Sequence, residues 1–214
     1  MLITFEGIEG SGKSLQIARA LAYLQQKGVA CILTREPGGT DFGLALREVL
    51  LGTNGCRREP WCELLLFLAD RYQHLKEVIE PALKRGLVVL SDRYQDATRA
   101  YQAAARGIPG SEIEKLTQLL GIIEPDHTIL LDLEPEEGLL RARTRNSASP
   151  SAAAEGRFEA EDLDFHRRVR DAYLELAGRS PRRIHVVQAS GTPDEVFSRI
   201  ARLFDRWIPA KSKL

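Results

Sequence analysis

The chain has 214 residues and no net charge, with 30 Lys and Arg against 30 Asp and Glu. Its hydrophobic content of 43% and charged content of 28% exclude a disordered chain, a collagen and a disulfide miniprotein. The balanced charge gives no excess of positive charge that would indicate a nucleic-acid partner. No run of about 18 apolar residues is present, so no membrane span is expected. The length predicts a single domain over residues 1–214.

The cysteines and the first residues bear on the compartment. Cys31, Cys56 and Cys62 have neither CxxC nor zinc spacing, and their number is odd. The first apolar stretch is interrupted by Thr4 and Glu6, which is typical of a strand and not of a signal segment. We therefore expect reduced thiols and a cytoplasmic protein.

Apolar periodicity and turn residues predict strands that alternate with helices along the chain. The predicted strands, all short and continuously apolar, are Leu2–Glu6, Val29–Thr34, Leu87–Leu90, Thr128–Leu131 and Ile184–Val187. The predicted helices are Lys13–Lys27, Phe42–Leu51, Trp61–Arg85 as one or two helices, Thr98–Arg106, Ser111–Leu120, Pro135–Arg145, Leu163–Ala177 and Pro193–Trp207. Continuously apolar strands indicate an α/β protein, with a parallel sheet covered by helices on both faces.

Two local features punctuate this pattern. The residues Gly52–Pro60 are polar and predict a loop. Ser111–Glu114 resembles a capping box at the start of its helix.

The segment Gly7–Ser14 fits the phosphate-loop pattern G-x-x-x-x-G-K-[ST] at every fixed position, between a predicted strand and a predicted helix. Its glycines allow backbone N–H groups to surround phosphate, and the helix start adds a positive dipole. Lys13 would meet the β- and γ-phosphates, and the Ser14 hydroxyl would meet Mg²⁺. A chance match is the weaker interpretation in this context. The predicted ATP-binding residues are Gly7, Ile8, Glu9, Gly10, Ser11, Gly12, Lys13 and Ser14.

A phosphate loop predicts a bound nucleoside triphosphate but does not identify the phosphate acceptor. The base-reading motif Asn-Lys-x-Asp of GTPases is absent from the chain. Helicases and transporter ATPases are usually much longer. A small kinase is therefore the favoured class.

The segment Ser147–Ala154 is small, uncharged and without useful periodicity. Arg141, Arg143 and Arg145 precede it, and Arg157 follows. A flexible segment between arginines predicts a mobile lid, over about residues 141–160, that brings positive charge onto a ligand. A surface insertion with solvated charges is the alternative.

Three further motifs, taken with the phosphate loop and the candidate lid, resemble the thymidylate kinase family. They are Thr34–Thr40 (Thr-Arg-Glu-Pro-Gly-Gly-Thr), Leu66–Arg71, and Asp92-Arg93-Tyr94 followed by Ala100-Tyr101-Gln102. The resemblance extends from Leu2 to about Ala177 and continues weakly beyond. It implies a P-loop NTPase fold with a five-stranded parallel sheet, ATP and dTMP as substrates, Mg²⁺ as cofactor, a role in dTTP synthesis, and a homodimer.

The resemblance also implies roles for single residues, and the physics of each position agrees. Arg93 would grip the dTMP phosphate between donor and acceptor, at the strand end where α/β sheets bind ligands. Asp92 would join Ser14 in the Mg²⁺ shell. Phe67 and Arg71 share a helix face and would stack on thymine and donate to its carbonyl. The surrounding leucines alone would make Phe67 a core residue.

Further acceptor contacts follow from the same resemblance. Arg47 would be a second contact to the monophosphate, and Glu36-Pro37 a turn that lines its site, often with a cis proline. Glu9 would lie near the 3′-hydroxyl. Tyr101 would crowd the 2′ position and favour deoxyribose, and two residues would contact the base or sugar, namely Thr98 and Gln102.

The lid is where the chain departs from the family pattern. Some members carry an arginine inside the phosphate loop, but Gly10 and Ser11 occupy those positions here. Members of this kind use a lid arginine, and Arg157 matches that pattern best. Arg145 is the next candidate, or lies against adenine. The inserted Ser147–Ala154 lengthens the lid, and Ala97 stands where the family commonly has serine.

The resemblance implies in-line transfer of the γ-phosphoryl group to an ionised phosphate, which needs no general base. Three alternatives remain: another nucleoside monophosphate kinase, a P-loop switch without an acceptor, and an inactive nucleotide-binding module. Trp61–Leu68 and Ile113–Leu120 could form a dimer face, although apolar helix faces are more often core.

Overall fold

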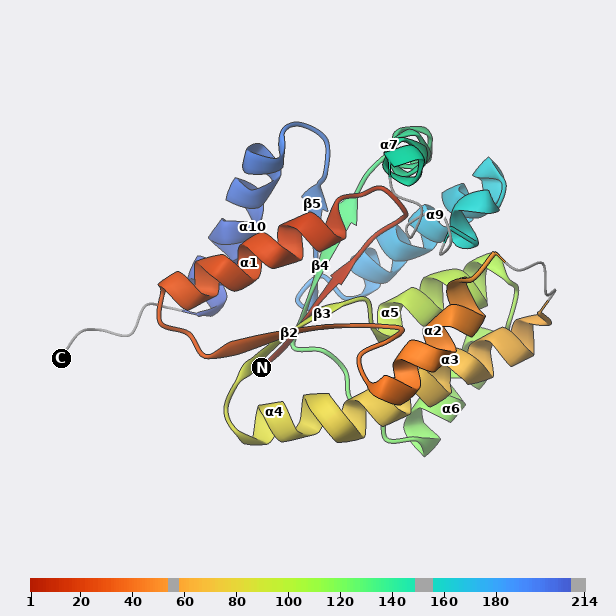
Figure 1. Cartoon of the computed structure of the whole chain (residues 1–214), viewed down its shortest axis with the longest axis horizontal. Coiled ribbons are helices and arrows are strands. Elements are labelled where there is room, and N and C mark those ends of the chain that lie inside the picture. Colours follow the sequence, from red (N-terminus) through yellow and green to blue (C-terminus); the bar gives the residue numbers. More distant parts are fainter. Residues whose placement is uncertain (54–57, 149–155, 209–214) are drawn as a thin grey trace.

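The computed structural model describes residues 1–53, 58–148 and 156–208. Five strands form one parallel sheet in the order β2-β3-β1-β4-β5 (Figure 1). The strands are β1 (Leu2–Glu6), β2 (Cys31–Arg35), β3 (Val88–Asp92), β4 (His127–Asp132) and β5 (Ile184–Gln188). The predicted α/β class and five-stranded parallel sheet are confirmed.

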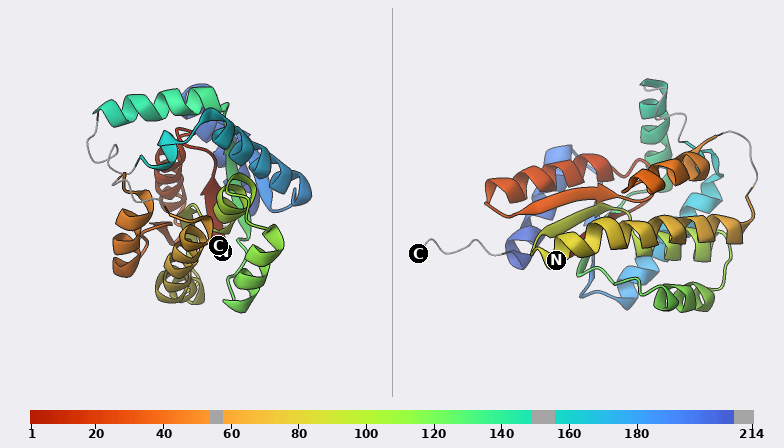
Figure 2. Two further views of the ribbon diagram at one scale, coloured as in Figure 1. Left: turned by 90° about the vertical axis from the view of Figure 1, so that its right-hand side faces the viewer. Right: turned by 60° about the horizontal axis from the view of Figure 1, so that its bottom comes forward.

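Helices surround this sheet and follow the predicted order. They are α1 (Lys13–Gln26), α2 (Asp41–Leu51), α3 (Pro60–His74), α4 (Glu80–Lys84), α5 (Gln95–Thr98), α6 (Gly110–Leu119), α7 (Pro135–Ala148), α9 (Leu163–Arg179) and α10 (Pro193–Trp207). Helix α7 stands out from the body of the molecule (Figure 2). The predicted loop between Gly52 and Pro60 falls partly on residues 54–57, outside the described residues.

The central strands β1, β3 and β4 are buried on both faces, whereas the edge strands β2 and β5 are partly exposed. Ile3 pairs with Leu90, and both join the core that contains the apolar sides of α1 and α10. Their neighbours Leu2 and Val89 point to the opposite face and join the core beneath α4. Successive strand side chains point to opposite faces, so a continuously apolar strand needs cover on both.

Two predicted helices contain π-helical segments that a 3.6-residue period does not reveal. The Trp61–Arg85 segment is α3, a π-helix over Leu75–Ile79, and α4. Pro81 lies in the first turn of α4, where it has no N–H to donate to an α-helical ladder. The predicted Thr98–Arg106 helix is α5 followed by a π-helix over Arg99–Ala105. Such π turns are frequent at functional sites, and the second one carries Tyr101.

The predicted capping box at Ser111–Glu114 is wrong. Helix α6 begins at Gly110 with Pro109 as its N-cap, so Ser111 lies inside the first turn and caps nothing. The fixed φ of proline suits the entrance of a helix, so α6 begins earlier in the chain than the predicted Ser111. The capping box occurs instead at α10, where the Thr192 hydroxyl accepts from the Glu195 N–H and the Glu195 carboxylate accepts from the Thr192 N–H.

The functional motifs meet at the carboxyl ends of the central strands. The phosphate loop follows β1, the Glu36-Pro37 turn follows β2, and Arg93 follows β3. Parallel strands end at the same edge of a sheet, where ligands bind in open α/β folds. Within the described ranges, helices lack the length and apolar character needed to cross a bilayer.

Candidate active site

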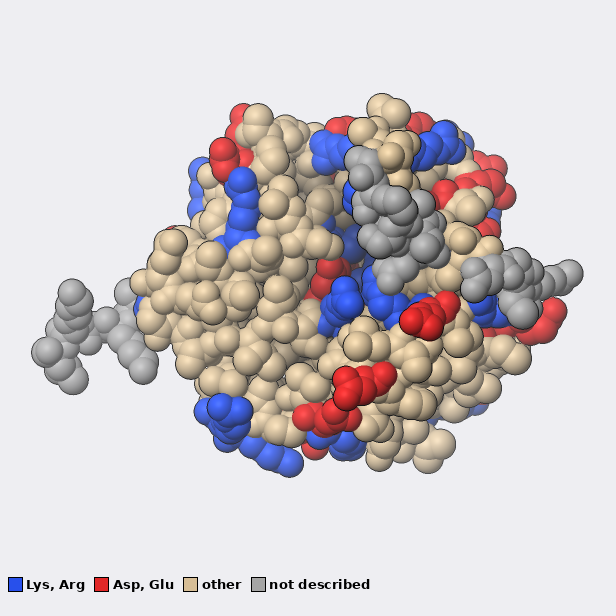
Figure 3. Space-filling model, viewed as in Figure 1, with Lys and Arg blue, Asp and Glu red and all other residues tan. Residues whose placement is uncertain are grey.

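A cavity of about 350 Å³ lies at this edge of the sheet. Basic and acidic side chains gather in a hollow at the centre of Figure 3. The cavity brings together most of the predicted site residues, from both the donor and the acceptor sets. These are Glu9, Gly10, Lys13, Ser14, Glu36, Pro37, Arg47, Phe67, Arg71, Asp92, Arg93, Thr98, Tyr101, Gln102 and Arg145.

The phosphate loop is packed closely against α7. A Cβ on Gly10, whose φ is 72°, would lie 1.9 Å from the Gly138 carbonyl oxygen. A Cβ on Gly138 would in turn lie 2.5 Å from the Glu9 carbonyl oxygen. Two glycines on separate segments therefore allow two backbones to touch. Sequence analysis missed Gly138, because only its place in the fold gives it this role.

The Lys13 side chain folds back over the phosphate loop. Its ammonium group donates to the carbonyl oxygens of Gly7 at 2.9 Å and Ile8 at 2.8 Å. Burial lowers the pKa of Lys13 to about 8, so the side chain is still largely charged at neutral pH. A buried cation beside carbonyl oxygens is ready to exchange them for phosphate oxygens.

Ser14 and Asp92 meet although they are far apart in the chain. The Ser14 hydroxyl donates to the Asp92 carboxylate at 2.9 Å. A hydroxyl and a carboxylate are the hard oxygen donors that Mg²⁺ takes, so the pair fits that ion. The described residues contain no group of three or more His, Cys, Asp or Glu that could hold a metal alone. A magnesium ion here would need phosphate oxygens as further ligands.

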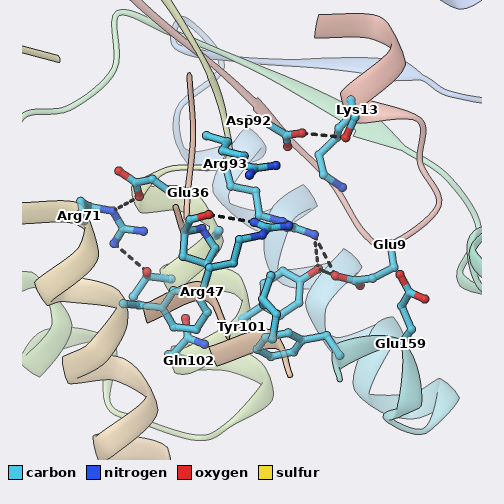
Figure 4. A pocket seen from close by; sticks show the side chains of 18 of the residues that line it. Glu9, Lys13, Glu36, Arg47, Arg71, Asp92, Arg93, Tyr101, Gln102 and Glu159 are labelled. Carbon is cyan, nitrogen blue, oxygen red and sulfur yellow. Dashed lines mark hydrogen bonds and ion pairs between the residues drawn. The ribbon is translucent and has the colours of Figure 1, made fainter. Parts of the chain in front are cut away.

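Arg93 occupies the centre of the cavity (Figure 4). Its φ is 70°, the left-handed region that residues other than glycine rarely adopt. Its Nη2 donates to Glu9 at 2.8 Å and to the Tyr101 hydroxyl at 3.1 Å. Its Nη1 donates to the Gly7 carbonyl at 3.2 Å and to the Tyr173 hydroxyl at 3.3 Å. Backbone strain kept at a site of this kind is typical of a functional residue.

Glu9 is a buried carboxylate held by several neighbours. The Tyr101 hydroxyl donates to it at 2.6 Å, and the His166 Nδ1 lies 3.2 Å from its other oxygen. Burial opposes ionisation, but His166, Arg93 and Lys13 outweigh it and hold the pKa of Glu9 well below its usual range. His166 was not predicted as a site residue, because in the sequence it is only one of several residues on the buried side of α9.

The acceptor wall is built around Arg71, which is 1% exposed. Four of its five N–H donors are used, by the Glu36 carboxylate, the Gln95 amide, the Thr98 hydroxyl and the Tyr94 carbonyl, at 2.7–3.0 Å. Arg71 still lines the cavity, so its last donor is available there.

The Glu36-Pro37 turn has the cis peptide bond that the resemblance implied. Arg47 reaches back and donates to the Pro37 carbonyl at 2.8 Å. His74, a residue that sequence analysis missed, lies with its Nδ1 2.9 Å from Glu36. The turn is therefore fixed from α2 and α3 together.

Phe67 lies between the hydrophobic core and the cavity. It packs partly buried against the core and also lines the cavity, with its ring 6.2 Å from that of Phe158. Gln102 donates to Glu63 at 2.8 Å, which fixes its amide in the cavity wall. Ala97 lines the cavity without offering a polar side chain.

The lid arginines are placed differently from each other. Arg145 lines the cavity and pairs with Glu159. Arg157 is not among the lining residues, and its guanidinium pairs with Glu63 and donates to the Leu50 carbonyl at 3.1 Å. Most of the predicted insertion Ser147–Ala154 lies outside the described residues.

A phosphate loop between the first strand and first helix of a five-stranded parallel sheet defines a P-loop nucleotide-binding protein. The thymidylate kinase family model matches residues 5–200. The chain belongs to the thymidylate kinase family.

Similar proteins agree over almost the whole chain. A thymidylate kinase of Nitratidesulfovibrio vulgaris is 50% identical over 203 residues, covering 94% of each chain. One from Trichlorobacter lovleyi is 52% identical over 202 residues, covering 94% of this chain and 95% of its own. A crystal structure of thymidylate kinase from Ehrlichia chaffeensis superposes with a TM-score of 0.74 at 32% identity, covering 96% of this chain and 98% of that one.

Asp70 supports the acceptor wall at an electrostatic cost. Its Oδ1 accepts from the Gly38 N–H at 3.0 Å, while its buried Oδ2 has no hydrogen-bond partner among the described residues. Burial, together with the nearby Glu36 charge, raises the pKa of Asp70 from 3.8 to about 6. The folded protein therefore keeps a proton on Asp70 that the unfolded chain releases between pH 3.8 and 6.

We expect Asp70→Asn to change how stability depends on pH. As pH rises through this window, the free energy of unfolding of the parent falls, whereas the uncharged variant has no such loss. The difference in free energy of unfolding between the two therefore changes by about 3 kcal/mol in favour of the variant. Urea unfolding at several pH values measures it. The exposed Asp171→Asn serves as control and should give a flat difference, and a flat difference for Asp70→Asn would contradict the raised pKa.

Proposed function

We propose that this protein transfers the γ-phosphoryl group of Mg·ATP to the 5′-phosphate of dTMP, giving dTDP and ADP for dTTP synthesis. The family supports this activity. The observation that carries it is a single cavity in which the phosphate loop and an arginine-lined second half meet at Arg93.

The donor half suits a triphosphate. The glycine-rich loop and the start of α1 direct backbone N–H groups and a positive dipole at phosphate. Lys13 would exchange the carbonyls of Gly7 and Ile8 for the β- and γ-phosphate oxygens. Ser14 and Asp92 would hold Mg²⁺, which neutralises charge on those phosphates when it is bound.

The acceptor half suits a pyrimidine deoxynucleotide. Arg47 and Arg93 would bind its phosphate, and the Phe67 ring would stack on the base. The remaining donor of Arg71 would meet a base carbonyl. Tyr101, fixed by its bond to Glu9, leaves little room for a 2′-hydroxyl. The wall is completed by Glu36, Pro37, Thr98 and Gln102.

The chemistry needs charge neutralisation more than proton transfer. The acceptor is a phosphate oxygen with a second pKa near 6, so it is mostly ionised at neutral pH. A bond forms between this oxygen and the γ-phosphorus as the bond to the β-phosphate oxygen breaks, and ADP leaves with the electron pair. Lys13 and Arg93 lie on the two sides of this exchange and would stabilise the charge that spreads over the transferred group.

An acceptor panel tests this proposal. ADP release is followed with Mg·ATP and each of dTMP, dUMP, AMP, GMP and CMP, and without acceptor. We expect turnover with dTMP well above every other acceptor. Faster turnover with a purine monophosphate would contradict the base pocket, and ADP release without any acceptor would identify a nucleotide switch or ATPase.

The segment 141–160 is proposed to act as a lid that brings an arginine onto the transferred phosphoryl group. Arg157 must leave Glu63 to do so, whereas Arg145 already faces the cavity. The family pattern assigns the catalytic role to Arg157 and an adenine contact to Arg145. Closure would also exclude water and limit hydrolysis of ATP.

We expect Arg157→Ala to lower kcat by roughly 10³-fold, because one positive charge would be missing at the transition state. Arg145→Ala should mainly raise the KM for ATP. Steady-state kinetics of both variants, with the exposed Arg143→Ala as control, separates the roles. If Arg157→Ala stays within a few-fold of the parent while Arg145→Ala loses kcat, the catalytic arginine is Arg145.

We also propose a homodimer formed through α2 and α3. Exposed apolar side chains recur at helical spacing on these neighbouring helices and make one stripe on each. They are Phe42 and Val49 on α2, and Trp61, Leu65 and Tyr72 on α3. Ile113 of α6, by contrast, is buried against α3 as core. A second copy of the chain would cover both stripes.

Sedimentation equilibrium tests the dimer. The parent should have the mass of two chains, and Leu65→Lys should shift it to one, because a charge cannot be buried unpaired in an apolar interface. Leu140→Lys on α7 replaces an exposed leucine away from the stripes and should leave the mass unchanged. A parent with the mass of one chain would contradict the proposal.

The cytoplasm is the proposed location. Cys31 and Cys62 are free thiols, and Cys56 lies outside the described residues. Free thiols are typical of a reducing compartment. ATP and dTMP remain the proposed partners, and the neutral chain offers no charge excess for nucleic acid.

A further inference from the structure

Glu6 is a buried charged residue that lies outside the phosphate-loop motif. It is the last residue of β1 and has no exposed surface. It does not line the cavity. Both of its carboxylate oxygens are bound: one accepts from the Tyr94 N–H at 2.8 Å and the other from the Tyr173 hydroxyl at 2.7 Å. Burying a carboxylate costs free energy unless it is hydrogen-bonded. A buried glutamate at this position therefore indicates that its carboxylate has a specific role.

The first of these bonds fixes the backbone of Arg93. The Tyr94 N–H belongs to the peptide group that directly follows Arg93, the residue with the left-handed φ of 70°. The flanking groups are also tied, since the Arg93 N–H donates to the Phe5 carbonyl and the Ser91 hydroxyl donates to the Arg93 carbonyl. The carboxylate of Glu6 therefore holds one side of a strained peptide that would otherwise relax.

The second bond reaches the guanidinium of Arg93. The Tyr173 hydroxyl donates to Glu6 and accepts from Arg93 Nη1 at 3.3 Å. One carboxyl group thus touches the backbone of Arg93 on one side and its side chain, through a hydroxyl, on the other. Tyr173 is itself fully buried on α9 and does not line the cavity.

We propose that Glu6 is a positioning residue for Arg93, which it holds by the Tyr94 peptide and through the Tyr173 hydroxyl in the conformation that meets the transferred phosphoryl group. This inference rests on the proposed function, because it assumes that Arg93 acts on that group. Small displacements of such a group are costly, and a misplacement of about 1 Å can lower a rate by about 100-fold.

Three variants separate the two bonds. Glu6→Gln keeps an oxygen that can accept from the Tyr94 N–H, but its amide N–H₂ group cannot accept the Tyr173 proton. Tyr173→Phe removes the hydroxyl and leaves the backbone bond. Glu6→Ala removes both bonds. Burial raises the pKa of Glu6 to about 7, so the assays are run near pH 8, where the carboxyl group is ionised.

The expected result is a fall in kcat for dTMP phosphorylation, by about 10- to 100-fold, in both Glu6→Gln and Tyr173→Phe. The KM for ATP should stay within about two-fold, and the midpoint of thermal unfolding should not fall in Glu6→Gln. The double variant should be no slower than the slower single variant, because both act through one path. Glu6→Ala should be slower than either.

Asp132→Asn is the matched control. Asp132 is also a carboxylate at a strand end, on the neighbouring β4, but its hydrogen-bond partner is Arg170. It does not line the cavity with Arg93, and its replacement should leave kcat within about two-fold of the parent. A loss as large as that of Glu6→Gln would point to a general effect of altering strand ends.

A second comparison uses Arg93→Ala as background. There Glu6→Gln should have no further effect on the residual rate, since its target is gone. The proposal is overturned if Glu6→Gln and Tyr173→Phe both keep kcat within two-fold, or if Glu6→Gln is equally harmful without Arg93. If the parent itself fails to phosphorylate dTMP, the proposed function fails instead, and the two failures are distinguished.

Discussion

The guanidinium of Arg93 is the point on which the rest of the site depends. It contacts the phosphate loop at Gly7, the carboxylate of Glu9, and two tyrosine hydroxyls on other segments. Arg93 is the one residue other than glycine with positive φ in the described part of the chain. The strand that carries it ends inside the cavity, and the left-handed turn directs the side chain across the cavity. In the proposed function, a cation fixed in this place would join a donor half to an acceptor half.

The charges of the site satisfy one another. Lys13 binds loop carbonyls, Ser14 binds Asp92, Arg93 binds Glu9, and Arg145 binds Glu159. Isolated buried charges would be strongly unfavourable, so these contacts stabilise the charged side chains of the cavity. Phosphate oxygens would replace protein oxygens one for one. Binding two polyanions is then an exchange of partners and not the creation of new buried charge.

The acceptor side follows a different principle. Arg71 has almost no freedom, because it is bound to four groups on two other segments and Glu36 is shared with His74. In the proposed function, so rigid a wall would select by shape and by the one Arg71 N–H that has no partner among the described residues. A site built to hydrogen-bond a particular edge rejects ligands that leave its buried groups unpaired. In the proposed function, the donor half would exchange partners with phosphate, whereas the acceptor half would be fixed by its own hydrogen bonds.

The sequence by itself determined the parts of this protein whose residues are contiguous. The phosphate loop, the Glu36-Pro37 turn and the Asp92-Arg93 strand end are local patterns, and parallel strands bring their ends to one edge of the sheet. Short continuous apolar runs were enough to predict the five strands. Of these, β1, β3 and β4 are buried along most of their length, whereas β2 and β5 at the sheet edges are partly exposed.

Only the tertiary structure decided which distant groups meet. The partners of Glu6, Glu9 and Gly10 are Tyr173, His166 and Gly138, and each comes from a helix more than 100 residues further along the chain. Contacts of this kind depend on packing between elements and leave no periodic trace in the sequence. The same holds for the two π-helical segments and for the pairing of Arg157 with Glu63. The residues that carry the chemistry could therefore be predicted from the sequence, whereas their positions relative to one another depend on the fold.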